Sequence, residues 1–152
     1  MDSTQESLPL VSVVMPVYNG TKTLDRVIRS VLAQSRSDWE LLAVDDASTD
    51  GSWEVLCRYA AADTRVRPMR LEVNNGPGAA RNAALAVARG QWIAYVDQDD
   101  EFFADYFEHI AKASAQGDVL VFAYDLVEWV PDARPNPVPG GLHFRRVQVL
   151  IG

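Results

Sequence analysis

The chain has 152 residues, the length of one ordinary domain, and 48% of them are hydrophobic, which is enough for a substantial core. Its formal net charge of -7 argues against general nucleic-acid binding, because phosphate backbones are held by clustered Lys and Arg. The single cysteine, Cys57, excludes an internal disulfide and a zinc site built from several cysteines.

Short apolar runs alternate with segments of helical spacing along the chain. In chain order we predict a strand over 11–15 that Pro16 stops, a helix over 21–34, a strand over 39–44, a helix over 52–62, a strand over 66–71, a helix over 79–89 that Gly90 stops, a strand over 91–96, a helix over 103–115 and a strand over 119–130. This alternation predicts an α/β fold with a Rossmann-like, mainly parallel sheet flanked by helices. The carboxyl ends of the strands, where such sheets bind ligands, should therefore lie at one edge.

Four acidic side chains stand close together directly after the fourth predicted strand. Asp97 and Asp99 are two positions apart, so in extended backbone they point to the same side and can share a divalent cation. Their oxygens suit Mg²⁺ or Mn²⁺, and a cation offsets their mutual repulsion. The alternative is a solvated turn that caps the next helix, the role we expect for Asp100 and Glu101. No role is predicted for Gln98.

Three further side chains belong to the same predicted edge of the sheet. Asp46 follows the second strand and can accept hydrogen bonds from a nucleobase or ribose, or else form an Asx turn or a helix cap. Tyr18 can stack on a base or pack half-buried. Arg81 lies near a glycine-rich helix start, where it can reach a phosphate or pair with a strand-end acid.

Four motifs occur in order: VSVVMPVYNG (11–20), ELLAVDDASTDGS (40–52), NNGPGAARNAAL (74–85) and GQWIAYVDQDDEF (90–102). Their order and spacing resemble those of the inverting family 2 glycosyltransferases, which have the GT-A fold. The resemblance covers about residues 10–125. Each motif alone is weak evidence, but four in the family's order are specific.

The resemblance implies roles at the nucleotide end of a donor site. In the family, the positions that match Pro16, Val17 and Tyr18 line the base pocket, and we place the adjacent Asn19 with them. The second acid of the DD pair, which is Asp46 here, contacts the base, usually uracil. We therefore expect a UDP-sugar as the donor.

The resemblance also implies roles at the diphosphate end. Asp97, the first acid of the DxD motif, lies near the ribose or the metal, and Asp99 coordinates Mn²⁺ or Mg²⁺ that bridges the donor diphosphate. We place Arg81 among the donor-binding residues. Family members transfer the sugar by direct displacement while a carboxylate base deprotonates the acceptor hydroxyl, and they make many polysaccharides and glycoconjugates.

The C-terminal region departs from the family pattern. We expect a nucleotide-sugar-binding core over 1–130, a Pro/Gly-rich loop over 131–141, and the start of a truncated or shortened C-terminal part over 142–152. The family's base and acceptor surface belong to a second half, so no catalytic base is assigned. We expect donor binding with little or no transfer by this chain alone, and the acceptor stays open among carbohydrate, lipid and protein.

The N-terminus has no apolar signal core, and no apolar run approaches the roughly 20 residues of a membrane span. We expect a cytoplasmic protein. Association with the inner face of the membrane through regions outside this sequence stays open, as does the oligomeric state.

Three other functions compete with this interpretation. A nucleotidyltransferase would carry a Gly-rich loop with a basic residue directly after its first strand, where this chain has PVYNGTKTLD (16–25). A phosphotransfer receiver domain would end its third strand with a phosphoacceptor Asp, where this chain has RLEVNN (70–75). A non-catalytic nucleotide-sugar-binding module is the alternative that these residues do not separate from an enzyme.

Overall fold

The computed structural model of the protein describes residues 8–114, 119–123 and 147–151. Within these ranges the chain forms β1 (Val11–Val17), α1 (Leu24–Leu32), β2 (Trp39–Asp45), α2 (Ser52–Ala62), β3 (Val66–Arg70), α3 (Gly76–Leu85), β4 (Trp92–Tyr95), α4 (Tyr106–Ala113), β5 (Val119–Ala123) and β6 (Val147–Ile151). The described strands form one sheet in the order β3-β2-β1-β4-β6-β5. Neighbours among β3, β2, β1 and β4 are parallel, whereas β6 is antiparallel to both β4 and β5. The predicted α/β class with a mainly parallel sheet is confirmed.

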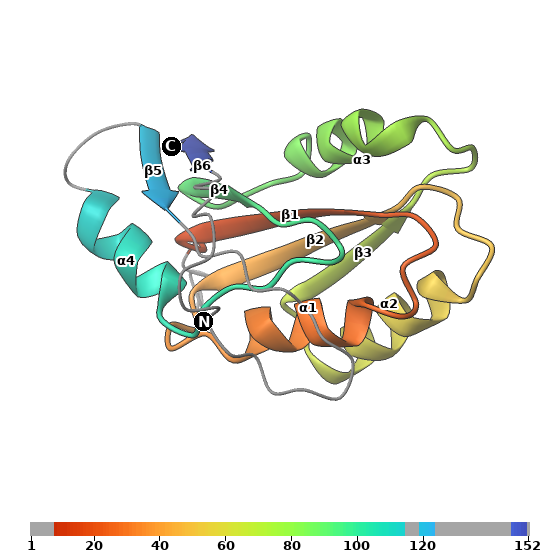
Figure 1. The fold of residues 1–152 in the computed structure, drawn as a ribbon, viewed down its shortest axis with the longest axis horizontal. Coiled ribbons are helices and arrows are strands. Elements are labelled where there is room, and N and C mark those ends of the chain that lie inside the picture. The colour runs from red at the N-terminus through yellow and green to blue at the C-terminus, as the bar shows by residue number, and fades with distance from the viewer. Residues whose placement is uncertain (1–7, 115–118, 124–146, 152) are drawn as a thin grey trace, which may run out of the picture.

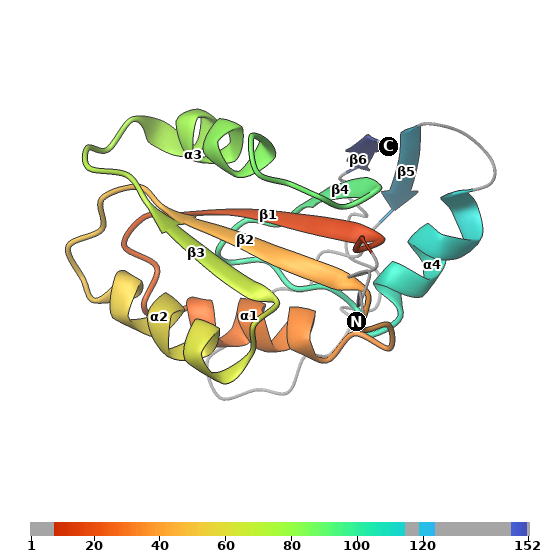
Figure 2. The same cartoon turned by 180° about the vertical axis from the view of Figure 1, so that it is seen from behind.

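Helices cover both faces of the sheet. Figures 1 and 2 show α1 and α2 against one face and α3 against the other. Val13 and Met15 of β1 belong to the buried cluster that includes Ile28 of α1, whereas Val14 packs in the cluster with Ala80 of α3. Because β1 and β2 are buried on both sides, their apolar residues occupy consecutive positions rather than only every second one.

β1 continues through Pro16 to Val17, so the prediction that proline ends this strand is wrong. The carbonyl of Val14 accepts a hydrogen bond from the N–H of Val96 at 3.1 Å, on the β4 side. The backbone N–H and C=O groups of every second residue in a strand point towards the same neighbouring strand. The backbone nitrogen of Pro16, two residues after Val14, therefore also points towards β4. Because β4 ends at Tyr95, the missing N–H of Pro16 removes no bond from the sheet.

The helices α1 and α3 begin at residues other than those predicted. α1 begins at Leu24 rather than at residue 21, after a turn in which the N–H groups of Thr23 and Leu24 both donate to the Gly20 carbonyl. α3 begins at Gly76 rather than at residue 79, with Pro77 in its first turn. Proline suits that position, because the first N–H groups of a helix have no partner within the helix.

α3 ends at Leu85 instead of continuing to residue 89, because the following backbone binds the sheet. The N–H of Arg89 donates to Glu40 Oε1 at 2.7 Å, and the N–H of Gly90 donates to Ser12 Oγ at 2.8 Å. These groups lie far away in sequence, so helical spacing alone does not reveal the end of the helix.

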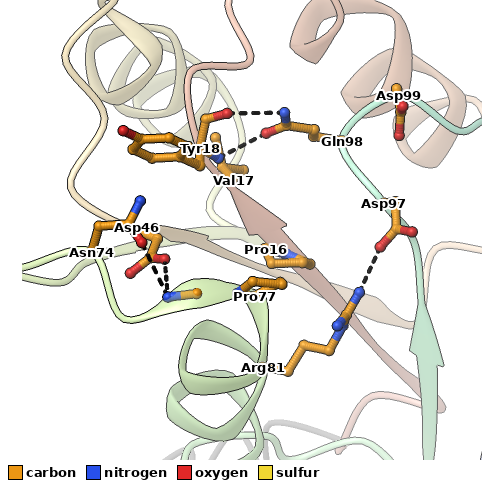
Figure 3. Close-up of a pocket in the computed structure, with 11 residues that line it drawn as sticks. Pro16, Val17, Tyr18, Asp46, Asn74, Pro77, Arg81, Asp97, Gln98 and Asp99 are labelled. Carbon is orange, nitrogen blue, oxygen red and sulfur yellow. Dashed lines mark hydrogen bonds and ion pairs between the residues drawn. The ribbon is translucent and has the colours of Figure 1, made fainter.

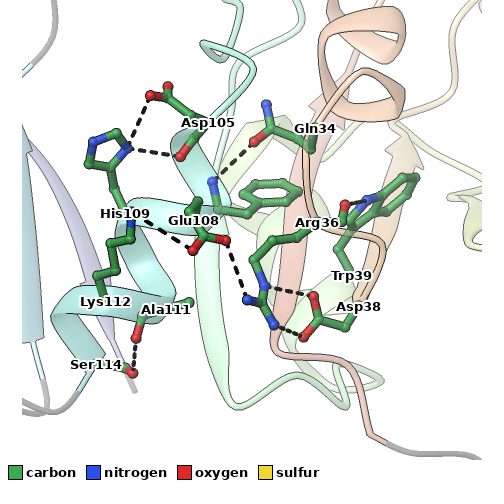
Figure 4. Close-up of polar contacts among 11 residues, drawn as sticks. Gln34, Arg36, Asp38, Trp39, Asp105, Glu108, His109, Ala111, Lys112 and Ser114 are labelled. Carbon is green, nitrogen blue, oxygen red and sulfur yellow. Dashed lines mark hydrogen bonds and ion pairs between the residues drawn. The ribbon is translucent and has the colours of Figure 1, made fainter.

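α4 spans Tyr106–Ala113 rather than 103–115 and is tied to the segment before β2 (Figure 4). The N–H of Phe107 donates to Gln34 Oε1 at 3.0 Å, and Arg36 lies 3.4 Å from Glu108. These contacts close the edge of the core where Phe107 is buried.

The C-terminal predictions are tested only in part. Of the predicted strand 119–130, residues 119–123 form β5, and 124–130 lie outside the described residues, as does the predicted loop 131–141. β6 was not predicted, and it joins the sheet between β4 and β5. Among the described residues, no helix combines the length and apolar character needed to span a bilayer.

Candidate functional site

The ends of β1, β2 and β4 and the start of α3 surround a cavity of about 400 Å³ (Figure 3). It is lined by Pro16, Val17, Tyr18, Asp46, Asn74, Gly76, Pro77, Arg81, Asp97, Gln98 and Asp99. Every residue predicted to bind the donor or the cation is in this set except Asn19. The structure therefore brings these residues together at one edge of the sheet, and the ligand that they bind stays a prediction.

Asp46 holds the start of α3 against the end of β2. The residue is only 2% exposed, and its carboxylate accepts from the N–H of Asn75 at 2.9 Å and from the N–H of Gly76 at 2.7 Å. This is the helix-cap role that the sequence left open beside base binding. Each carboxylate oxygen can accept more than one hydrogen bond, so Asp46 keeps capacity for a ligand in the cavity.

Arg81 of α3 pairs with Asp97 across the cavity (Figure 3). Its Nη2 lies 2.7 Å from Asp97 Oδ1, with both side chains about one third exposed. The sequence left open whether Arg81 contacts a phosphate or an acid, and in the structure it contacts the acid. The guanidinium offsets part of the negative charge that the acidic cluster gathers at this edge.

The acidic cluster forms a turn and not an extended segment, which corrects the predicted geometry. The N–H of Asp100 donates to the Asp97 carbonyl at 3.1 Å. Arg26 of α1 holds the turn from outside, because it donates to the Asp99 carbonyl at 2.7 Å and lies 2.6 Å from Glu101. α4 begins only at Tyr106, so Asp100 and Glu101 lie outside its first turn and the predicted capping role is wrong.

The acids of this turn provide ligands that suit a divalent cation. Asp97 and Asp99 both line the cavity. No group of three His, Cys, Asp or Glu side chains that could enclose a metal ion occurs among the residues the structure describes. Magnesium sites at nucleotides commonly use one or two carboxylates and complete their coordination with water and phosphate oxygens. The pair therefore fits a cation that a bound diphosphate would complete.

Tyr18 stands at the rim of the cavity and is 47% exposed. The side chain of Gln98 contacts its main chain twice: Oε1 accepts from the Tyr18 N–H at 2.8 Å, and Nε2 donates to the Tyr18 carbonyl at 3.0 Å (Figure 3). Sequence reasoning missed this role of Gln98. The available signal was a carboxamide between two acids, which offers both a donor and an acceptor.

Asn19 does not line the cavity and instead ties the β1–α1 loop to the β2–α2 loop. Its Oδ1 accepts from the N–H of Thr49 and its own N–H donates to Ser48 Oγ, both at 2.9 Å. The N–H of the next residue, Gly20, donates to Ser52 Oγ at 2.8 Å. The residues after Tyr18 are therefore held by the neighbouring loop and by the start of α2.

Asp50 completes this attachment. Its carboxylate accepts from the N–H of Thr21 at 3.1 Å and from the N–H of Ser52 at 3.0 Å. Burial favours a higher pKa for Asp50, but the hydrogen bonds from Ser52 and Thr21 outweigh it and lower the pKa from 3.8 to about 2. Asp50 is therefore ionised near neutral pH and supports the loop that carries Tyr18.

Comparison with known proteins places the chain in a family. Residues 12–148 match the model of glycosyl transferase family 2. TuaG of Bacillus subtilis, which carries a provisional assignment as a teichuronic acid biosynthesis glycosyltransferase, is 43% identical over 100 residues, or 66% of this chain and 40% of that protein. The chain spans 34% to 41% of the length of the first three curated relatives it matches.

Solved structures show the same fold. S. aureus TarS in complex with UDP-GlcNAc is 31% identical, with a TM-score of 0.68 over 72% of this chain and 32% of that chain. The mannosyltransferase PcManGT from Pyrobaculum calidifontis, in complex with GDP-Man and Mn²⁺, is 25% identical, with a TM-score of 0.66 over 76% of this chain and 35% of that chain. The fold is of the GT-A type, and the chain belongs to glycosyl transferase family 2.

Proposed function

We propose that this chain supplies the cation-dependent donor site of a glycosyltransferase and that the donor is a UDP-sugar. The observation that carries the proposal is the composition of the cavity. An exposed aromatic ring, a buried acceptor carboxylate, a guanidinium and an acidic turn meet at the carboxyl edge of a parallel sheet. This combination suits a ligand with an aromatic base at one end and a charged diphosphate at the other.

The nucleoside would occupy the side of the cavity formed by Tyr18 and Asp46. The exposed ring of Tyr18 offers a stacking surface for a base. The carboxylate of Asp46 accepts hydrogen bonds and donates none, so it favours a base that presents an N–H, as uracil does. Its contacts with Asn75 and Gly76 keep this acceptor fixed before a ligand arrives.

The diphosphate would occupy the side formed by Arg81, Asp97 and Asp99. Arg81 can donate to phosphate oxygens, and the two acids would hold Mn²⁺ or Mg²⁺. The cation would neutralise the charge of the nucleoside diphosphate that leaves when the sugar is transferred. The acids cannot bind the diphosphate directly, because like charges repel, so this arrangement predicts that donor binding depends on the cation.

The structural neighbours support each half of the proposal. TarS has been solved with UDP-GlcNAc, and PcManGT with GDP-Man and Mn²⁺. The first favours a uracil nucleotide and the second a divalent cation. Because the two donors differ in their base, the choice of uracil is a separate claim that needs its own measurement.

Isothermal titration calorimetry with UDP, GDP and CDP, each with and without Mn²⁺, tests the proposal. We expect UDP to bind most tightly, and to bind much more weakly without Mn²⁺. Asp99→Asn should lose the effect of Mn²⁺, while Asp105→Asn, which neutralises an exposed acid outside the cavity, should retain it. Equal affinities for the three nucleotides would overturn the base assignment. Identical UDP binding by Asp99→Asn and the parent, whatever the Mn²⁺ concentration, would overturn the cation role.

A further inference from the structure

Gln98 joins the acidic turn to the segment that carries Tyr18 (Figure 3). Its side-chain amide makes two hydrogen bonds with the main chain of Tyr18, at 2.8 Å and 3.0 Å, across 80 positions of sequence. Two bonds from one planar group fix both the position and the orientation of the contacted backbone. Because Gln98 lies between Asp97 and Asp99, this contact links the two acids directly to Tyr18.

The glycine at position 20 leaves room for this contact. A Cβ added at Gly20 would lie 2.7 Å from Gln98 Oε1, closer than real Cβ atoms approach other atoms. A side chain at residue 20 would therefore displace the amide from Tyr18. Gly20 also donates its N–H to Ser52 Oγ at 2.8 Å, so the segment is supported by the start of α2 on one side and by Gln98 on the other.

A glutamine meets the chemical requirements of this link. The side chain must accept from an N–H and donate to a carbonyl at the same time, which an amide does and an ionised glutamate does not. Methionine has a similar length without either strong hydrogen-bonding group. The exchange of Gln98 for methionine therefore removes the link while it keeps most of the side-chain volume.

We propose that Gln98 is a positioning residue that couples cation binding at Asp97 and Asp99 to nucleotide binding at Tyr18. The inference rests on the proposed function. Besides the direct contact between the cation and the diphosphate, it gives a second route of coupling, which runs through the protein. A cation that fixes the acidic turn also fixes Gln98 and, through it, the main chain of Tyr18. The nucleotide then meets a segment that is already ordered, so its binding costs less conformational entropy.

The test measures a coupling factor, which is the dissociation constant of UDP without Mn²⁺ divided by that with saturating Mn²⁺, obtained by calorimetry on the 152-residue chain. Gln98→Met should lower this factor by about five-fold or more, the lower end of typical coupling between two sites. Gly20→Ala should lower it as well, because it displaces the amide without changing residue 98. Gln91→Met is the matched control, since Gln91 is exposed and precedes the opposite end of β4.

The factor compares two affinities of one variant, so a smaller folded fraction affects both and largely cancels. A coupling factor in Gln98→Met equal to that of the parent would overturn the inference while leaving the proposed donor site intact. An equal fall in Gln91→Met would also overturn it, because the effect would not depend on the contact with Tyr18. If the parent binds no UDP with or without Mn²⁺, the proposed function itself fails, and the inference fails with it.

Discussion

The guanidinium Nη2 of Arg81 lies 2.7 Å from Oδ1 of Asp97, so α3 already supplies a positive partner for one acid of the turn. The two side chains are 34% and 39% exposed, and water screens the pair. Such exposed ion pairs contribute only about 0.2–1 kcal/mol to stability. Arg81 can therefore exchange Asp97 for a diphosphate, and Asp97 can exchange Arg81 for a cation, at small cost.

Replacement of Arg81 by methionine tests this exchange, because it removes the charge and keeps a long side chain. We expect Mn²⁺ alone to bind about two- to five-fold more tightly, since Asp97 no longer has a competing partner. UDP in saturating Mn²⁺ should bind more weakly, since a phosphate contact is lost. Calorimetric titrations of Mn²⁺ and of UDP measure the two effects. Arg58→Met, on the exposed side of α2, is the control, and changes of the same sign for both ligands would contradict the exchange.

Asp46 should contribute to stability even without nucleotide, because it accepts from two N–H groups at the start of α3. Asp46→Ala should lower the free energy of unfolding by about 0.5–2 kcal/mol, as the loss of a helix cap does. Asp46→Asn should cost less, since its amide retains one acceptor oxygen. Urea unfolding in nucleotide-free buffer measures both. An Asp46→Ala variant as stable as the parent would mean that these contacts do not hold the helix.

The positions of the main elements followed from the sequence because burial there is strong and local. The helix over 52–62 matches α2, and the apolar run 39–44 lies within β2. The ends of other elements depend on partners distant in sequence, and no pattern within the element reports them. α3 stops early because Arg89 and Gly90 donate to side chains of the sheet, and Pro16 stays within β1 because β4 has already ended beside it.

The candidate site was predictable in its location but not in its internal contacts. Strand ends of a parallel sheet converge whatever residues follow them, which placed Asp46 and Asp97 at one edge. The pairing of Arg81 with Asp97, and that of Gln98 with Tyr18, depend on backbone turns that spacing does not specify. The extended geometry assumed for the two acids failed for this reason, since a hydrogen-bonded turn had replaced the strand.

Gly90 should be far less tolerant of substitution than Gly78. A Cβ at residue 90 would lie 2.8 Å from the carbonyl carbon of Val11 and 2.7 Å from Ser12 Oγ, so the backbone of β1 or of the loop must shift. We expect Gly90→Ala to lower the free energy of unfolding by about 1–3 kcal/mol. Gly78 lies in α3 with no atom within 4 Å of the added carbon, so Gly78→Ala should raise stability by about 0.5–1 kcal/mol. Urea unfolding of both variants gives the comparison, and equal effects would contradict it.

The lowered pKa of Asp50 predicts that the folded protein loses stability in acid. Its pKa is about 2 in the folded protein against the ordinary value of 3.8, so the folded state favours the ionised carboxylate. The stabilisation is complete above about pH 4 and is lost as the pH falls towards 2, because protonation then weakens the hydrogen bonds from Thr21 and Ser52. Asp50 is exposed, so solvent screening keeps the gain modest.

Asp50→Asn should remove this contribution to the pH dependence. The variant should be less stable than the parent at neutral pH, and the difference should shrink between about pH 4 and pH 2 as the parent loses its own carboxylate charge. Urea unfolding midpoints measured across this range give the two curves. The stability curve of Ser52→Ala, which removes a hydroxyl donor to Asp50, should lie between the curves of the parent and of Asp50→Asn. Parallel curves for the parent and Asp50→Asn would show that the ionised form of this carboxylate does not hold the loop beside Tyr18.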